Sequence, residues 1–70
     1  MKGWAAVFRG PRVQADLLQA VLEAAGLKAV QLHDAGDYAG EFFDARVFVP
    51  EEQAAEARRL ISEAGQAGGP

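Results

Sequence analysis

Cysteine is absent from the 70-residue sequence, which excludes both a disulfide framework and thiolate chemistry. The chain has no threonine, and Ser62 is its only serine. Nucleophilic catalysis needs such a side chain beside a base, and Ser62 falls on the predicted outer side of a helix, so we predict that the protein is not an enzyme. His33 is the only histidine, and the spacing of the acidic residues after it fits neither an EF-hand nor a zinc signature. We therefore predict no metal site and no cofactor.

Strong positive charge is also missing. The formal net charge is −3, whereas proteins that bind nucleic acid usually carry a basic surface, so we expect no nucleic-acid partner. No run approaches the roughly 18 apolar residues that a membrane-spanning helix needs. Residues 1–3 lead directly into a strand-like run rather than into the apolar part of a signal peptide. These features predict a soluble cytoplasmic protein with no membrane partner.

One strand-to-helix unit occurs twice in the chain. Residues 7–11 (VFRGP) precede a predicted helix that ends at Gly26, and residues 47–50 (VFVP) precede one that ends at Gly65. In each unit the proline suits the first helical position, because its φ angle is already helical and no amide donor is needed there. In each unit the glycine suits the end of a helix. Leu27 follows Gly26, which is the position where a Schellman cap places a hydrophobic contact.

Apolar residues recur every three or four positions in both predicted helices, which is typical of one buried face. In the first helix, from Pro11 to Ala25, the predicted buried residues are Val13, Leu17, Leu18, Val21, Leu22 and Ala25. In the second, which starts at Pro50, they are Ala54, Ala57, Leu60, Ile61 and Ala64.

Three segments are predicted to be strands: Trp4 to Arg9, Leu27 to His33, and Phe42 to Val49. The element order is therefore β-α-β-β-α. A right-handed crossover leaves room for the third strand between the first two. The predicted fold is an α+β, truncated ferredoxin-like plait with an antiparallel sheet in the order 1-3-2 and both helices on one face. Residues 1–64 form a single domain, and residues 65–70 are predicted to be a disordered tail.

This fold leaves one face of the sheet uncovered. Alternation in the second strand places Val30 and Leu32 on one side and Gln31 on the other, where it would share the open face with Arg46 and Phe48. An exposed aromatic patch usually marks a contact surface.

The facing of the first strand is less constrained. If the repeat holds, Val7 matches Val47 in the core, and Trp4 and Phe8 join the open face. The opposite choice, with Trp4 and Phe8 buried, stays open because a one-residue shift reverses every side chain. The interface candidates are Trp4, Phe8, Arg46 and Phe48.

Two segments are candidates for ligand binding. Arg9, Gly10 and Arg12 surround the start of the first helix, where backbone amides attract anions and arginines bind phosphate or carboxylate. An ordinary turn with solvated arginines is the alternative, and no P-loop or dinucleotide spacing is present. His33 and Asp34 begin an acidic loop at the same end of the sheet, which is predicted to be solvated or to form a salt bridge with the arginines.

The sequence resembles a small bacterial family labelled putative prokaryotic signal-transducing proteins. The resemblance lies in residues 15–18 (ADLL), 22–27 (LEAAGL), 46–52 (RVFVPEE) and 57–58 (AR), and it covers most of the chain except the loop and the tail. That family is similar in fold to PII nitrogen regulators, which bind nucleotides between subunits and signal through the loop between their second and third strands. The resemblance implies a signalling role, with residues 34–41 in the place of that loop.

We therefore predict a small, non-enzymatic regulatory or protein-interaction module that acts as a homodimer or other homo-oligomer. A 70-residue chain buries only about 60% of the surface that its unfolded form exposes, so help from a second subunit is expected. The edge of the first strand and the open sheet face are the expected joining surfaces. The alternative is a sensor of the PII or ACT type that binds an anionic metabolite or nucleotide near Arg9, Gly10 and Arg12.

Overall fold

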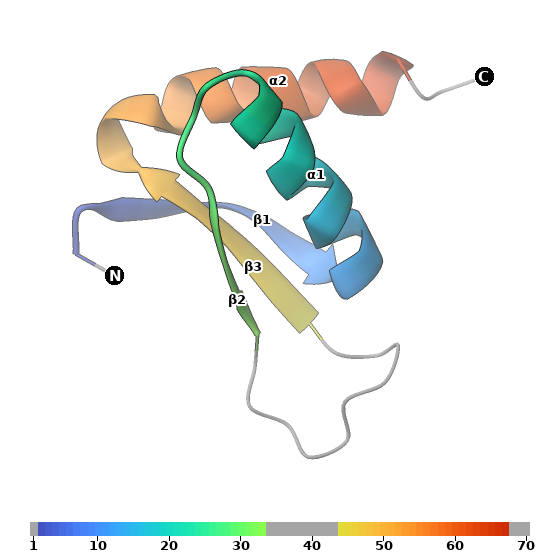
Figure 1. Cartoon of the computed structure of the whole chain (residues 1–70), viewed down its shortest axis with the longest axis horizontal. Helices are drawn as coiled ribbons and strands as arrows, with labels where there is room; N and C mark the ends of the chain where they lie inside the picture. Colours follow the sequence, from blue (N-terminus) through green and yellow to red (C-terminus); the bar gives the residue numbers. More distant parts are fainter. Residues whose placement is uncertain (1, 34–43, 68–70) are drawn as a thin grey trace.

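The computed structural model describes residues 2–33 and 44–67 of the chain. These residues form a three-stranded sheet and two α-helices, arranged as in Figure 1. The elements in chain order are β1 (Trp4–Pro11), α1 (Arg12–Ala24), β2 (Val30–His33), β3 (Asp44–Pro50), the 3-10 turn η2 (Glu51–Gln53) and α2 (Ala54–Ala67). Both pairings are antiparallel, and β3 lies between β1 and β2. The predicted β-α-β-β-α order and the 1-3-2 sheet are confirmed.

Each helix follows a proline of nearly identical backbone conformation. Pro11 has φ −58° and ψ 146°, and Pro50 has φ −55° and ψ 146°. These ψ values are extended rather than helical, so both prolines are the residue before the helical segment, not its first residue as predicted. After Pro50 the chain makes the short 3-10 turn before the α-helix begins.

The two helices end differently. Gly26 has φ 90°, its amide donates to the carbonyl of Glu23, and the amide of Leu27 donates to the carbonyl of Leu22, each at 3.0 Å. These are the two hydrogen bonds of a Schellman cap, so that prediction is confirmed. Gly65 does not end α2, because its φ is not positive and the helix continues to Ala67. The predicted disordered tail is therefore wrong for residues 65–67, and residues 68–70 lie outside the described part.

The core lies between the sheet and the helices and is thin. Its fully buried or nearly buried members are Ala15, Leu22, Ala45, Val47, Val49, Ala54 and Ala57. The predicted buried face of α2 is confirmed, because Ala54 and Ala57 are buried and Leu60, Ile61 and Ala64 are half-buried. The prediction for α1 is partly wrong, because Val13 and Leu17 are 75% and 63% exposed and Ala25 is also exposed. Ala15 takes their place beneath the helix.

Strand β1 contains a bulge that changes which side chains face the core. Ala6 pairs with Phe48 and Phe8 pairs with Val47, so Val7 is the extra residue. A bulge lets two successive residues point to the same side of a sheet, and both Val7 and Phe8 pack against the core. The prediction that Phe8 lies on the open face is therefore wrong, although Trp4, opposite Pro50, does lie there.

The facing of β2 is the reverse of the prediction. Val30 and Leu32 lie opposite Phe48 and Arg46, which places them on the open face. Gln31 lies opposite the buried Val47 and therefore points toward the helices. Within the described residues, no helix has the length and apolar character needed to cross a membrane.

Candidate functional site

The open face of the sheet is the side that neither helix covers. From the register of the three strands, it carries Trp4, Ala6, Arg9, Val30, Leu32, Arg46, Phe48 and Pro50. Three of the four interface candidates, Trp4, Arg46 and Phe48, therefore share one surface. Val30 and Leu32 extend that surface across β2, so it is more apolar than the sequence predicted.

The centre of the open face is partly covered by its own side chains. The Arg46 guanidinium carbon lies 5.9 Å from the centroid of the Phe48 ring, a distance typical of a cation–π contact. Phe48 keeps only 8% of its surface exposed, and Trp4, Val30 and Leu32 are half-buried. The apolar side chains of the open face are therefore buried or half-buried within one chain and are not isolated protruding rings.

The structure separates the predicted ligand residues. Arg9 lies opposite Arg46 on the open face, whereas Arg12 begins α1, on the other side of the sheet. Gly10 and His33 lie on either side of Ala45, in one row on the side that faces the helices. Asp34 lies outside the described residues. Arg9, Arg12 and His33 therefore do not share one side of the sheet.

Gly10 makes room for an aromatic ring of the protein itself. A Cβ atom at position 10 would lie 2.8 Å from Cζ and 3.3 Å from Cε2 of Phe8. Because Gly10 does not have a positive φ, its lack of a side chain matters for space and not for backbone conformation. The ring of Phe8 occupies the space that a ligand approaching Gly10 would need.

Arg12 lines a shallow hollow at the start of α1. Pro11, Arg12, Val13 and Asp16 border it, and its volume is about 280 Å³. Asp16 places a carboxylate on the same rim as the arginine, which disfavours an anionic ligand there.

A polar network joins α1 to β2, and sequence reasoning missed it. The Gln31 side-chain amide donates to Oδ1 of Asp16 at 2.8 Å and to Oε1 of Gln19 at 2.9 Å. The side-chain oxygen Oε1 of Gln31 contacts Nε2 of His33. Gln19 in turn donates to the carbonyl of Ala29 at 3.2 Å. These contacts give His33 and Gln31 structural roles between the helix and the edge strand.

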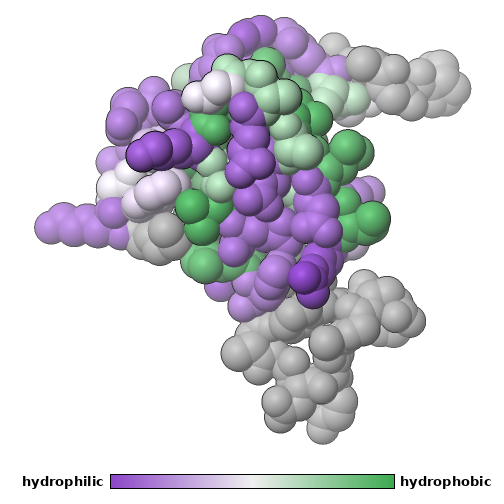
Figure 2. Space-filling model, viewed as in Figure 1, coloured by the Kyte–Doolittle hydropathy of each residue, from purple (hydrophilic) through white to green (hydrophobic). Residues whose placement is uncertain are grey.

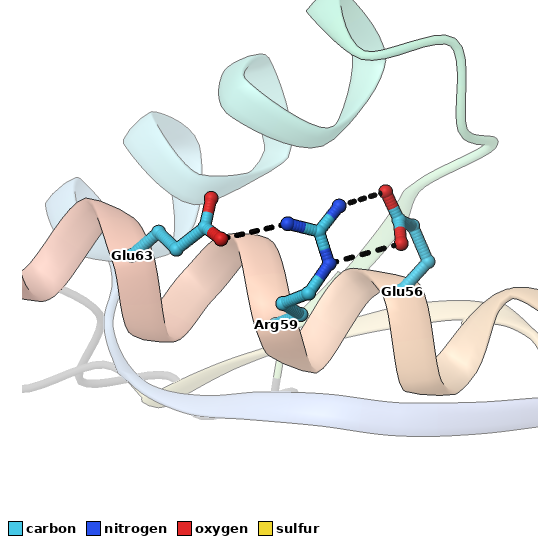
Figure 3. Close-up of polar contacts among 3 residues, drawn as sticks. All are labelled: Glu56, Arg59 and Glu63. Carbon is cyan, nitrogen blue, oxygen red and sulfur yellow. Dashed lines mark hydrogen bonds and ion pairs between the residues drawn. The ribbon is translucent and has the colours of Figure 1, made fainter.

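A second charged cluster lies on the surface of α2 (Figure 3). Arg59 donates from Nη1 to Glu63 at 2.7 Å and from Nε to Glu56 at 3.2 Å. The hydrogen bonds to Glu56 and then to Glu63 raise the pKa of Arg59 above its usual value. All three side chains are about half exposed, so the cluster supports the helix surface and offers no enclosed site.

The outer edge of β1 is poorly suited to pairing with another strand. The bulge at Val7 interrupts it, Arg58 donates to the carbonyl of Ala6 at 3.4 Å, and Pro11 lacks an amide donor at its end.

An apolar hollow of about 290 Å³ lies between the helices, lined by Phe8, Gln14, Leu17, Leu18, Ile61, Ala64 and Gly65. In the part of the chain that the structure describes, no group of three or more acidic or histidine side chains is placed to hold a metal ion.

A family model described as "Putative prokaryotic signal transducing protein" matches residues 4–65. The match spans every helix and strand of the structure except the last residues of α2. No curated protein and no solved structure matches the chain.

Proposed function

Because the chain belongs to the family of putative prokaryotic signal transducing proteins, we propose that it is a non-enzymatic protein-interaction module that acts as a homo-oligomer. The family description supports a role in signal transduction and does not name a reaction. The sole serine, Ser62, is exposed on α2. An exposed position on a helix surface favours a function without catalysis, because a nucleophilic serine needs a base held beside it.

The observation that carries the proposal is a thin core beside uncovered apolar surface. Four of the seven core residues are alanine, and the largest fully buried side chains are Leu22, Val47 and Val49. Meanwhile Val13 and Leu17 are mostly exposed, and the open face carries Trp4, Val30, Leu32 and Phe48. Small domains with this balance commonly gain stability by association, because the second chain buries surface that the first cannot cover.

Sedimentation equilibrium of the full chain tests the proposal directly. We expect a dimer or higher oligomer at tens of micromolar protein and a melting temperature that rises with protein concentration. A monomer across that concentration range, with a melting temperature independent of concentration, would contradict the proposal.

A thermal-shift screen with nucleotides and amino acids separates this function from that of a ligand sensor. We expect no ligand to raise the melting temperature of the wild-type protein. A shift that disappears in Arg12→Ala would instead place an anion site at the start of α1 and would favour the sensor.

A further inference from the structure

Helix α1 carries a second apolar stripe on the side opposite its buried residues. Its members are Val13, Leu17, Ala20 and Ala24, and all four are exposed. Their spacing of four, three and four residues brings them onto one side of a helix, as in a coiled-coil seam. Val13 and Leu17 are the large hydrophobic residues that stand most exposed among those described. Figure 2 shows apolar atoms on the molecular surface beside α1.

The order of sizes along this stripe is large, large, small, small. If a second copy of α1 lies antiparallel across it, Val13 meets Ala24 of the other copy and Leu17 meets Ala20. The two-fold axis then passes between positions 18 and 19, and each large side chain faces a small one at every level. A parallel arrangement would instead place leucine against leucine and leave a gap between the alanines. The stripe is therefore self-complementary in the antiparallel direction, as a two-fold interface requires.

Charges beside the stripe do not decide its direction. Arg12, Asp16 and Glu23 lie along one flank of α1, and their side chains are exposed. In an antiparallel two-fold pair the same flanks face each other, and Glu23 of one copy lies level with a point midway between Arg12 and Asp16 of the other. The attraction of Arg12 and the repulsion of Asp16 therefore largely cancel, so the sizes of the side chains along the stripe carry the inference.

We propose that a second copy of this chain binds on the outer stripe of α1, antiparallel and related by a two-fold axis. This rests on the self-association proposed above and assigns it to one surface. The open face is the competing surface, but its central ring, Phe48, is already buried within one chain and keeps only 8% of its surface exposed. Val13 and Leu17 have far more surface left to bury.

Sedimentation equilibrium of paired variants tests the assignment. Leu17→Glu places a charge in the seam on both copies, and we expect it to raise the dimer dissociation constant by about 100-fold or more. Ala6→Glu is the matched control, because Ala6 is exposed on the open face, and we expect it to leave the constant unchanged. Circular dichroism and the melting temperature at low concentration confirm that each variant is folded.

A size exchange distinguishes this geometry from general hydrophobic association. Ala20→Leu adds apolar surface yet places leucine against Leu17 of the other copy, so we expect it to weaken the dimer. Combining it with Leu17→Ala restores the pairing of large with small, and we expect the dimer to recover.

The outcomes separate the two proposals. A monomeric wild type overturns both. A dimer that dissociates in Ala6→Glu and persists in Leu17→Glu keeps the proposed function and overturns the α1 interface. A dimer that Ala20→Leu strengthens, or that none of these variants affects, also overturns the α1 interface.

Discussion

Substituting Gly10 by alanine tests how β1 is built, because it adds one methyl group directly beneath the Phe8 ring. That methyl group would lie 2.8 Å from the ring carbon Cζ, which is closer than a Cβ atom normally approaches another carbon. Phe8 packs against the core and also lines the hollow between the helices, so its ring must shift toward that hollow and give up part of its packing to accept the methyl group. Replacing glycine within a strand should otherwise stabilise the fold, by about 0.5–1 kcal/mol.

Overpacking a well-packed site costs about 1–3 kcal/mol, so we expect Gly10→Ala to lower the free energy of unfolding by about 1 kcal/mol after the glycine effect is included. For a chain of this size that corresponds to a melting temperature lower by about 4–8 °C. Thermal unfolding followed by circular dichroism at one fixed protein concentration measures the shift. Gly65→Ala is the control, because a Cβ there meets nothing within 4 Å, and we expect it to raise stability by about 0.5–1 kcal/mol.

A double-mutant cycle with Phe8→Leu isolates the contact between the two positions. The shorter side chain makes room at position 10, so Gly10→Ala should cost less in that background, with a coupling energy of at least about 0.5 kcal/mol. The reasoning is refuted if Gly10→Ala equals or exceeds the wild type in stability. It is also refuted if the cost is unchanged in the Phe8→Leu background.

Three further substitutions test other parts of the fold. Leu22→Ala removes the largest fully buried side chain and should cost about 2–5 kcal/mol in chemical denaturation, and a loss below about 1 kcal/mol would contradict the described core. Gly26→Ala forces a side chain into φ 90° and should cost about 1–2 kcal/mol, whereas an unchanged denaturation midpoint would show that the Schellman cap is not formed. Arg59→Ala removes an exposed ion-pair cluster, so its melting temperature should fall below that of the wild type only at low salt. Equal differences at low salt and at about 1 M salt, where the Debye length is about 3 Å, would show that the cluster acts through packing instead of charge.

The repeat predicted the element order and the sheet, but it was aligned incorrectly in the strands. The helices are related by an offset of 39 residues, which takes Pro11 to Pro50 and Gly26 to Gly65. Keeping that offset matches Phe8 with Val47, and the structure places both on the core side. Matching the letters Val-Phe instead shifts the strand by one residue, which moves Phe8 to the open face. The available signal was the length of the first unit, because matching Val-Phe in both units leaves one residue too many between Phe8 and Pro11.

Other features had no comparable signal in the sequence. The bulge at Val7 depends on pairing with β3, which is a contact between distant segments. The facing of β2 was reversed because strand alternation shows two faces without showing which one is buried. Only one face of β2 can pack toward the core. Gln31 lies on that face, and its hydrogen bonds to Asp16 and Gln19 make a polar side chain acceptable beneath α1.

The attachment of β2 has a consequence for how the molecule opens. This strand is four residues long, pairs on one side only, has no fully buried side chain, and is joined to α1 through the Gln31 amide. The hydrogen bonds that hold β2 lie close to solvent, where water can replace them more readily than it can replace apolar packing. We therefore expect β2 to separate from β3 in partial openings that leave β1 and β3 paired. In native-state hydrogen exchange, the amides of β2 should therefore lose protection before those of β3. If they do, the sheet of this protein consists of a two-stranded ribbon, β1 with β3, and a third strand that attaches and detaches within the native state.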